Sequence, residues 1–242
     1  MISLIDREIR VRLNSKLPLD PLQIVTMADY DMTLLLAASW FEFSVEKKVK
    51  HSLISSWSFN LNKGAYQIYV SDQANWSDGS QITSGDLVAN LKRSAHLKTS
   101  YGEAVSALIK VDHFEILSEK SFLLPTIDGN PQDNFFQRMG SSFLAIVNPK
   151  DWDGDMRMVT NNYSTGPYQI ESHSDQEIVL VQNKYFPSAN LLGAKVIRIR
   201  EPNLSSDLNE FLNQSSWESI TQICTLLDHA EYELLRSQQL PF

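Results

Sequence analysis

The chain has little of several things that chemistry at a protein site requires. It contains one cysteine, Cys224, which excludes an internal disulfide bond and any metal cluster held by several thiolates. Cys224 lies among the apolar residues of "ITQICTLLD" at helical spacing, which is typical of a buried, unreactive thiol. No two of the five histidines are four residues apart and no H-E-x-x-H occurs, so the sequence offers no zinc site.

Glycine is also scarce. The nine glycines are scattered over 242 residues and form no G-x-G-x-x-G, P-loop or G-x-S-x-G pattern. These absences exclude the common phosphate-binding loops and the strained turn that carries the nucleophile in many hydrolases. We therefore expect a protein that is not an enzyme and that carries no cofactor and no metal. A hydrolase assembled from scattered serine, histidine and aspartate side chains is the weaker alternative.

Basic residues are fewer than acidic ones, at 21 against 29, which gives a formal net charge of −8. The densest basic run, Lys47, Lys48 and Lys50, has no aromatic residues interleaved and is typical of a solvated surface. Because nucleic acid binding rests on clustered positive charge, we expect no nucleic acid to bind this chain.

Long apolar runs are missing as well. The longest, "LLLAASWF" at residues 34–41, is far below the roughly 20 residues that span a bilayer. The N-terminal stretch "MISLIDREIRVRLN" lacks the basic, apolar and small-residue regions of a signal peptide. We expect a cytoplasmic protein if this N-terminus is native, and a periplasmic or cell-surface one if a leader has been removed.

The patterns that are present predict a mixture of strands and helices. Alternating apolar residues predict a strand at 9–13, hairpins at 57–70, 113–127 and 164–183, and a strand at 195–200. Helices are predicted through "MTLLLAASWFEF" with Asp29 or Asp31 as its cap, after the Thr83-x-x-Asp86 capping box, and in two stretches beyond residue 204. The state of residues 135–147 stays open. Without a regular βαβ alternation, the fold class is mixed α/β, of the α+β-like kind.

The segment "DWDGD" resembles a calcium loop only superficially. Asp151, Asp153 and Asp155 alternate, but an EF-hand needs glycine at its sixth position and glutamate at its twelfth. Here Gly154 is fourth and Asn162 is twelfth. A solvated acidic turn is therefore the prediction.

Aromatic residues are numerous, and most are predicted to lie in the core or in hairpin pairs, as for Trp57, Trp76 and Tyr168. Tyr30 differs, because it follows a proline-bearing loop and stands at a predicted helix start. A helix N-terminus presents N–H groups and a positive dipole end that suit a carboxylate or carbonyl group of a ligand. We predict ligand contact there.

Several motifs, in order, resemble one known family. "SWSFNLNKGAYQIYVSDQANWSDGSQITSGDL" has the form of a hairpin followed by W-x-D-G, a spacer and T-[AS]-x-D-[VL]. "LPLDPLQ" (17–23), "STGPYQI" (164–170) and "IVLVQNKYF" (178–186) resemble the family's "LDP", "GTGPY" and "L-x-x-N-x-x-Y". The set is similar to the extracellular solute-binding protein family 5, the peptide-, nickel- and oligosaccharide-binding receptors of ABC importers. It departs from the family at Ser164, Gly85 and between Ala37 and Lys50.

The resemblance covers roughly residues 8–200 and implies a periplasmic-binding-protein type II-like lobe, with mixed sheets flanked by helices. Because the chain is about half the family's usual length, residues 1–242 are expected to form lobe I alone. Its subdomains are predicted at 1–45 plus 160–242, which hold the core sheet, and at 46–159, which is rich in hairpins.

The implied function is binding of a small solute or an oligopeptide, with an ABC-importer membrane permease as partner of the full-length form. The alternative is a cytoplasmic ligand-sensing module of a transcriptional regulator built on the same family. The predicted ligand-binding residues come from the first helix start and from the turn before Thr165: Ala28, Asp29, Tyr30, Asp31, Tyr163 and Ser164. A single lobe leaves the ligand half exposed, so the chain alone is predicted to bind weakly or not at all.

Overall fold

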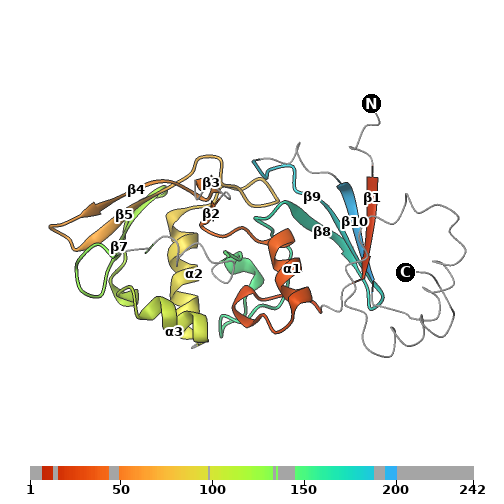
Figure 1. Cartoon of the computed structure of the whole chain (residues 1–242), viewed down its shortest axis with the longest axis horizontal. Coiled ribbons are helices and arrows are strands. Elements are labelled where there is room, and N and C mark those ends of the chain that lie inside the picture. Colours follow the sequence, from red (N-terminus) through yellow and green to blue (C-terminus); the bar gives the residue numbers. More distant parts are fainter. Residues whose placement is uncertain are drawn as a thin grey trace, which may run out of the picture.

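The computed structural model describes residues 7–12, 16–43, 49–97, 99–132, 135, 145–187 and 194–200. Two four-stranded sheets lie toward opposite ends of the long axis of the molecule, and helices α1 and α2 lie between them (Figure 1). Among the described residues, no helix has both the length and the apolar character needed to cross a bilayer.

The first sheet has the order β1-β10-β9-β8 and joins distant parts of the chain. Its strands are β1 (Arg7–Arg12), β8 (Tyr168–His173), β9 (Glu177–Gln182) and β10 (Ala194–Arg200). β1 runs parallel to β10, and the other two pairs are antiparallel. Helix α1 (Met27–Leu36) covers one face of this sheet. The core between them contains Leu19, Met32, Leu36, Tyr168, Ile178, Leu180, Ala194, Ile197 and Ile199.

The second sheet has the order β4-β5-β7-β6 and comes from one continuous region. Its strands are β4 (Ile54–Asn60), β5 (Ala65–Val70), β6 (Glu115–Ser118) and β7 (Ser121–Pro125). The larger core lies under this sheet, and helix α2 (Ser84–His96) contributes three buried apolar residues to it: Leu87, Val88 and Leu91. Helix α3 (Ser100–Ser106) follows α2.

Short elements complete the description. β2 (Phe41–Phe43) pairs with β3 (Val49–Ser52) in a small antiparallel sheet. Within the described residues lie three 3-10 turns: η2 (Pro21–Gln23), η3 (Val111–His113) and η5 (Pro149–Asp151). The predicted division into two subdomains, residues 1–45 with 160–242 and residues 46–159, stays a prediction.

Most local predictions are confirmed. The three hairpins form as β4–β5, β6–β7 and β8–β9, and the last predicted strand is β10. Trp76 and Tyr168 are buried, and Trp57 faces Ile68 across the first hairpin. Residues 145–147 have no regular structure. Residues 136–144, Cys224 and the helices predicted beyond residue 204 lie outside the described residues.

The two helix starts differ in how well they were predicted. Thr83 and Asp86 form the predicted capping box of α2, with each side chain bonded to the backbone of the other. The prediction for α1 was wrong at both ends. Thr26 is the N-cap and Asp29 is the third helical residue of a second capping box, and the helix ends at Leu36, before strand β2, instead of running on to Phe43. The helix therefore begins at Met27, earlier than expected, which changes the environment of the first predicted ligand residues.

Candidate functional site

The first turn of α1 contains the predicted group Ala28, Asp29, Tyr30 and Asp31. The Asp29 carboxylate accepts hydrogen bonds from the backbone N–H groups of Thr26 at 2.9 Å and Val25 at 3.3 Å. The Tyr30 N–H donates to the Thr26 carbonyl oxygen at 3.1 Å. Tyr30 is thus inside the helix rather than at an open end, and the carboxylate of Asp29 already stands at the positive end of the dipole.

This turn nevertheless presents an open surface. Asp31 is exposed, and Ala28 and Tyr30 are half-buried. The apolar neighbours Val25 and Met27 are 88% and 67% exposed. Large apolar side chains that are exposed side by side are a common property of surfaces that contact a ligand or another body.

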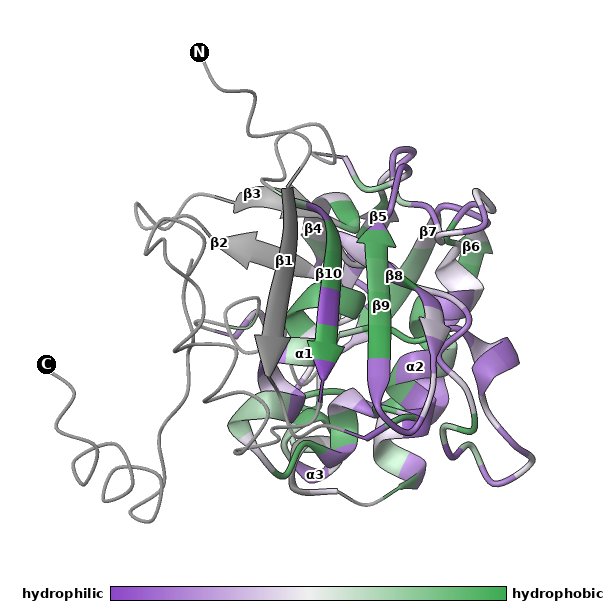
Figure 2. Ribbon diagram, turned by 90° about the vertical axis from the view of Figure 1, so that its right-hand side faces the viewer, coloured by the Kyte–Doolittle hydropathy of each residue, from purple (hydrophilic) through white to green (hydrophobic). Residues whose placement is uncertain are grey.

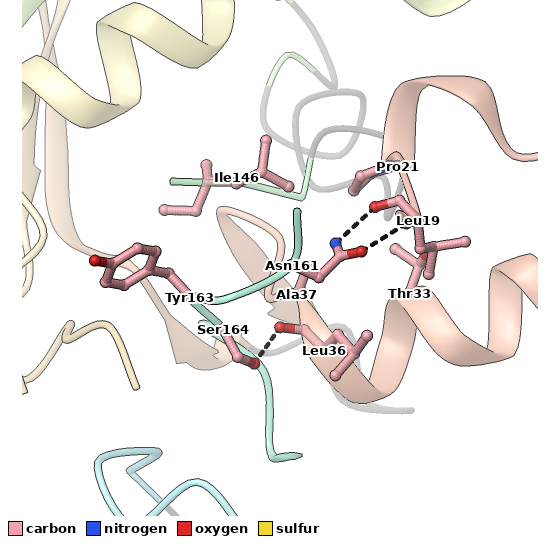
Figure 3. A pocket seen from close by; sticks show the side chains of 10 residues that line it. Leu19, Pro21, Thr33, Leu36, Ala37, Ile146, Asn161, Tyr163 and Ser164 are labelled. Carbon is pink, nitrogen blue, oxygen red and sulfur yellow. Dashed lines mark hydrogen bonds between the residues drawn. The ribbon is translucent and has the colours of Figure 1, made fainter. Parts of the chain in front are cut away.

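The second predicted group, Tyr163 and Ser164, lies beside the other end of α1 (Figure 3). Ser164 is buried, and its hydroxyl group lies within hydrogen-bonding distance of the carbonyl oxygens of Leu36 and Tyr168, one of which takes its proton. Tyr163 is half-buried, and the Lys150 ammonium nitrogen lies 5.1 Å from the centre of its ring. The Ser164 hydroxyl group is thus used within the chain, whereas the Tyr163 ring is partly accessible.

The turn that follows Ser164 caps the end of α1. The backbone N–H groups of Thr165 and Gly166 donate to the Leu36 carbonyl oxygen at 3.1 and 3.0 Å. The Thr165 hydroxyl group accepts from the Ala38 N–H at 2.8 Å. A methyl group on Gly166 would lie 2.6 Å from the Leu35 carbonyl oxygen, so the close approach requires glycine.

A small cavity connects this turn to α1 and to the loop before it (Figure 3). Its volume is ≈ 10 Å³, about the space that one water molecule needs. Tyr163 and Ser164 line it together with Thr33, Leu36 and Asn161, whereas residues 28–31 do not. The structure therefore brings the second predicted group to the end of α1 and leaves the first group at its start, with no ligand-sized enclosure at this cavity.

Asp151 organises the loop that leads to Tyr163, contrary to the prediction of a solvated acidic turn. It is buried, and its carboxylate accepts from the backbone N–H groups of Asn162 at 3.0 Å and Tyr163 at 3.1 Å, and from the Thr160 hydroxyl group. Asp153 and Asp155 are exposed, as predicted. No group of three potential metal-binding side chains occurs in the part of the chain that the structure describes.

A buried ion pair, missed at the sequence level, fixes the "LDP" loop. The Arg93 guanidinium group of α2 donates to both carboxylate oxygens of Asp20, at 2.5 and 3.1 Å, and to the Met156 carbonyl oxygen at 2.7 Å. The side chains of Arg93 and Asp20 are 1% and 8% exposed. Asp20, which is followed by a proline, is part of the recognised "LDP" motif. Its partner Arg93 lies 73 residues away, and no local sequence pattern indicates that the two residues pair.

The family-like motifs meet at one place, which we call the motif junction and define as Ser77, Gly79, Ser164, Gly166, Asn183 and Tyr185. The Ser77 N–H donates to the Ser164 carbonyl oxygen at 2.8 Å, and the Ser164 N–H donates to the Ser77 hydroxyl oxygen at 3.0 Å. The buried Asn183 side chain donates to the Gly166 carbonyl oxygen at 2.9 Å. The junction therefore links W-x-D-G, "STGPY" and "N-x-x-Y".

Gly79 completes the motif junction through a close contact. Its φ is +89°, and a methyl group there would lie 2.6 Å from Cζ of Tyr185. The neighbouring Asp78 accepts hydrogen bonds from the Ser80 hydroxyl group at 2.6 Å and the Ser80 N–H at 2.8 Å. The Ser80 hydroxyl group lowers the pKa of the Asp78 carboxyl group, and Lys150 lowers it further. This segment is thus a structural turn with no unexplained polar group.

The fold is that of a periplasmic-binding-protein type II-like lobe. A family profile described as "Bacterial extracellular solute-binding proteins, family 5 Middle" matches residues 48–206. The chain therefore belongs to the bacterial extracellular solute-binding proteins, family 5. No curated protein matches it.

Solved structures share the fold at low sequence identity. They include a periplasmic oligopeptide-binding protein from Borrelia burgdorferi (17% identity, TM-score 0.67, 85% of this chain and 45% of that one). The Escherichia coli murein tripeptide binding protein MppA is similar at 15% identity and TM-score 0.67, over 86% of this chain and 44% of that one. An OppA from Haemophilus influenzae is similar at 15% identity and TM-score 0.66, over 86% of this chain and 44% of that one. The chain thus spans less than half the length of these proteins.

Proposed function

We propose that this chain is the first lobe of a peptide-binding protein that serves an ABC importer outside the cytoplasmic membrane. Its membership of family 5 carries the proposal, because that family is described as extracellular and solute-binding. The similar fold of a periplasmic oligopeptide-binding protein supports a peptide over other solutes. The partner of the full-length form would be the membrane permease of the importer. The alternative of a regulator module gains no support from the described residues.

The geometry supports a division of labour among the six predicted ligand residues. Asp31, Tyr30 and Ala28 have accessible surface on the first turn of α1, and Tyr163 has it beside the last turn. We assign ligand contact to these four. We assign a positioning role to Asp29, whose carboxylate caps α1, and to Ser164, whose hydroxyl group ties the turn to α1.

One lobe gives only part of a binding site. The cavity between α1 and the Ser164 turn has room for about one water molecule, so a peptide would lie on an open surface. Ligand sites that bind tightly bury most of the surface of the ligand. Because half of that burial is missing here, we expect weak, rapidly exchanging binding by the chain alone.

The test is a titration of the isotope-labelled 242-residue chain with an equimolar mixture of tetrapeptides of random sequence, followed by amide chemical shifts. We expect saturable shifts at Ala28, Tyr30, Asp31 and Tyr163, with half-saturation in roughly the millimolar range, since each kilocalorie lost by open exposure weakens binding about fivefold. Tyr30→Ala should reduce the shifts. Tyr69→Ala, which removes an exposed tyrosine from the second sheet, is the matched control and should leave them unchanged.

Two results would contradict the proposal in different ways. Chemical-shift changes confined to the second sheet, or no changes at all, would show that the peptide does not bind at the assigned surface. Sub-micromolar binding by calorimetry would keep a binding function and reject the half-site, because a surface open on one side does not supply that affinity.

A further inference from the structure

Helix α1 carries apolar side chains on two opposite sides. On its buried side, Met32 and Leu36 belong to the core over the first sheet, whose strand β9 is hydrophobic along most of its length (Figure 2). On the other side, Met27 and Leu34 are 67% and 47% exposed. They are nearly two helical turns apart, so they lie along one line of the helix surface. A surface helix normally has polar residues on its outer side, so this exposed apolar side points to a contact made there.

The outer side of α1 has two further members, Tyr30 and Asp31. Residues three, four and seven positions after Met27 lie on the same side of a helix. Tyr30 is half-buried, whereas Asp31 is exposed. We call these residues the α1 stripe, defined as Met27, Tyr30, Asp31 and Leu34. The stripe thus presents large apolar side chains around one carboxylate.

The Asp31 carboxylate differs from the two other carboxylates of this region. Asp20 is paired with the Arg93 guanidinium group, and Asp29 caps the start of the helix. The Asp31 carboxylate makes no hydrogen bond and no ion pair with any residue that the structure describes. Residues 17–36 contain no lysine, arginine or histidine. The α1 stripe therefore has a negative charge that a positively charged group of a ligand can neutralise.

We propose that the α1 stripe selects peptides whose amino-terminal residue has a large apolar side chain. The amino group lies at Asp31, and the side chain lies against Met27 and Leu34. The Cβ atoms of residues three or four positions apart on a helix are about 5–6 Å apart, and one leucine residue separates its amino group from its methyl groups by a similar distance. The inference rests on the proposed function and adds Met27 and Leu34 to it as residues that determine specificity.

A second copy of the chain is a poorer occupant of the α1 stripe. In a symmetric pair that used the same surface twice, each copy would bring its own Asp31 carboxylate to the contact. The two like charges would oppose the pairing, whereas the amino group of a peptide complements the charge.

Three peptides separate the two contributions: Leu-Gly-Gly-Gly, its N-acetyl form and Gly-Gly-Gly-Gly. Each is titrated into the isotope-labelled 242-residue chain, and the amide chemical shifts of Met27, Asp31 and Leu34 are followed. We expect Leu-Gly-Gly-Gly to bind most tightly. Acetylation should weaken binding about threefold, in keeping with the small energy of an exposed ion pair. Loss of the leucine side chain should weaken it about fivefold, because an open surface buries only part of that side chain.

Two variants assign each contribution to its residue. Asp31→Asn should abolish the effect of acetylation and keep the preference for leucine, whereas Leu34→Ser should do the reverse. Asp155→Asn and Leu61→Ser make the same changes at exposed positions elsewhere and should leave all three affinities unchanged. Met27→Ser replaces Leu34→Ser if that variant does not fold.

The outcomes distinguish this inference from the proposed function. Equal affinity for the three peptides would overturn the inference and leave peptide binding intact. An acetylation effect that survives Asp31→Asn, or a leucine preference that survives Leu34→Ser, would overturn it as well. If no peptide shifts any amide signal, the proposed function fails and the inference fails with it. Shifts at the α1 stripe that grow with protein concentration in the absence of peptide would show that a second copy binds there instead.

Discussion

The motif junction and the first turn of α1 are built in opposite ways. At the junction, buried polar groups bond to one another, and Gly79 and Gly166 admit neighbours too close for any side chain. At the first turn of α1, Asp31 is exposed and Met27 is 67% exposed. The family motifs thus mark where the lobe is held together, and the predicted ligand surface lies where few internal contacts would be lost.

This difference predicts that substitutions near the junction and its supporting loops lower stability, while substitutions on the α1 surface change binding only.

The largest loss of stability is expected for Arg93→Met. Removing one member of a buried ion pair leaves Asp20 as an uncompensated buried charge, which costs about 3–5 kcal/mol of unfolding free energy. Urea denaturation measures it. Lys92→Met, at the exposed neighbouring position, should change stability little, and a similar loss in both variants would contradict the assignment.

The next effect concerns the close approach at the junction. Gly166→Ala should lower the unfolding free energy by about 1–3 kcal/mol, because the added methyl group meets the α1 backbone at 2.6 Å. Gly154→Ala is matched to it, since nothing lies within 4 Å of a methyl group there. Equal melting temperatures for the wild type and Gly166→Ala would show that the turn is not tightly held against α1.

A smaller effect depends on pH. The pKa of Asp78 is lowered from 3.8, chiefly by the Ser80 hydroxyl group. A lowered carboxyl pKa adds stability that is present above the unfolded value and is lost as the pH falls through the folded value. The stability difference between wild type and Asp78→Asn should therefore be constant well above pH 3.8 and shrink below it. Ser80→Ala should move the Asp78 titration upward by NMR, and an unmoved titration would reject that cause.

The smallest change in stability is expected on the α1 surface. Asp31→Asn should alter the unfolding free energy by less than about 0.5 kcal/mol, because the side chain is exposed. It should still weaken the peptide-induced shifts at Tyr30. If Asp31→Asn unfolds the protein as readily as Gly166→Ala, the contrast between junction and ligand surface is wrong.

Local patterns predicted much of the fold, because hairpins and caps are specified by neighbouring residues. The alternation around Asn62-Lys63-Gly64 and the pair Thr83 and Asp86 are of this kind. The true start of α1 had the same signal, since Thr26 and Asp29 repeat the spacing of Thr83 and Asp86. It was missed because the two nearby aspartates were read as caps.

Long-range contacts were not predictable in this way. Nothing local pairs Asp20 with Arg93, and the burial of Asp151 depends on the loop at 160–163 folding back over it. An acidic run is usually solvated, so the composition of "DWDGD" pointed to the surface. For the candidate site, ligand contact at Tyr163 and Ser164 stays a prediction. The sequence did not reveal that the Ser164 hydroxyl group bonds to the carbonyl oxygen of Leu36 or Tyr168.

The parallel pairing of β1 with β10 also determines the order in which the two sheets can fold during synthesis. β1 is the first described strand to leave the ribosome, yet its partner residues, Ala194 to Arg200, emerge after every other described strand. The second sheet takes all its strands from residues 54–125 and can assemble while synthesis continues. A nascent chain arrested after residue 187, whose last part the ribosome still covers, should therefore protect β5 and β7 from protease, while β1 and α1 are still cleaved.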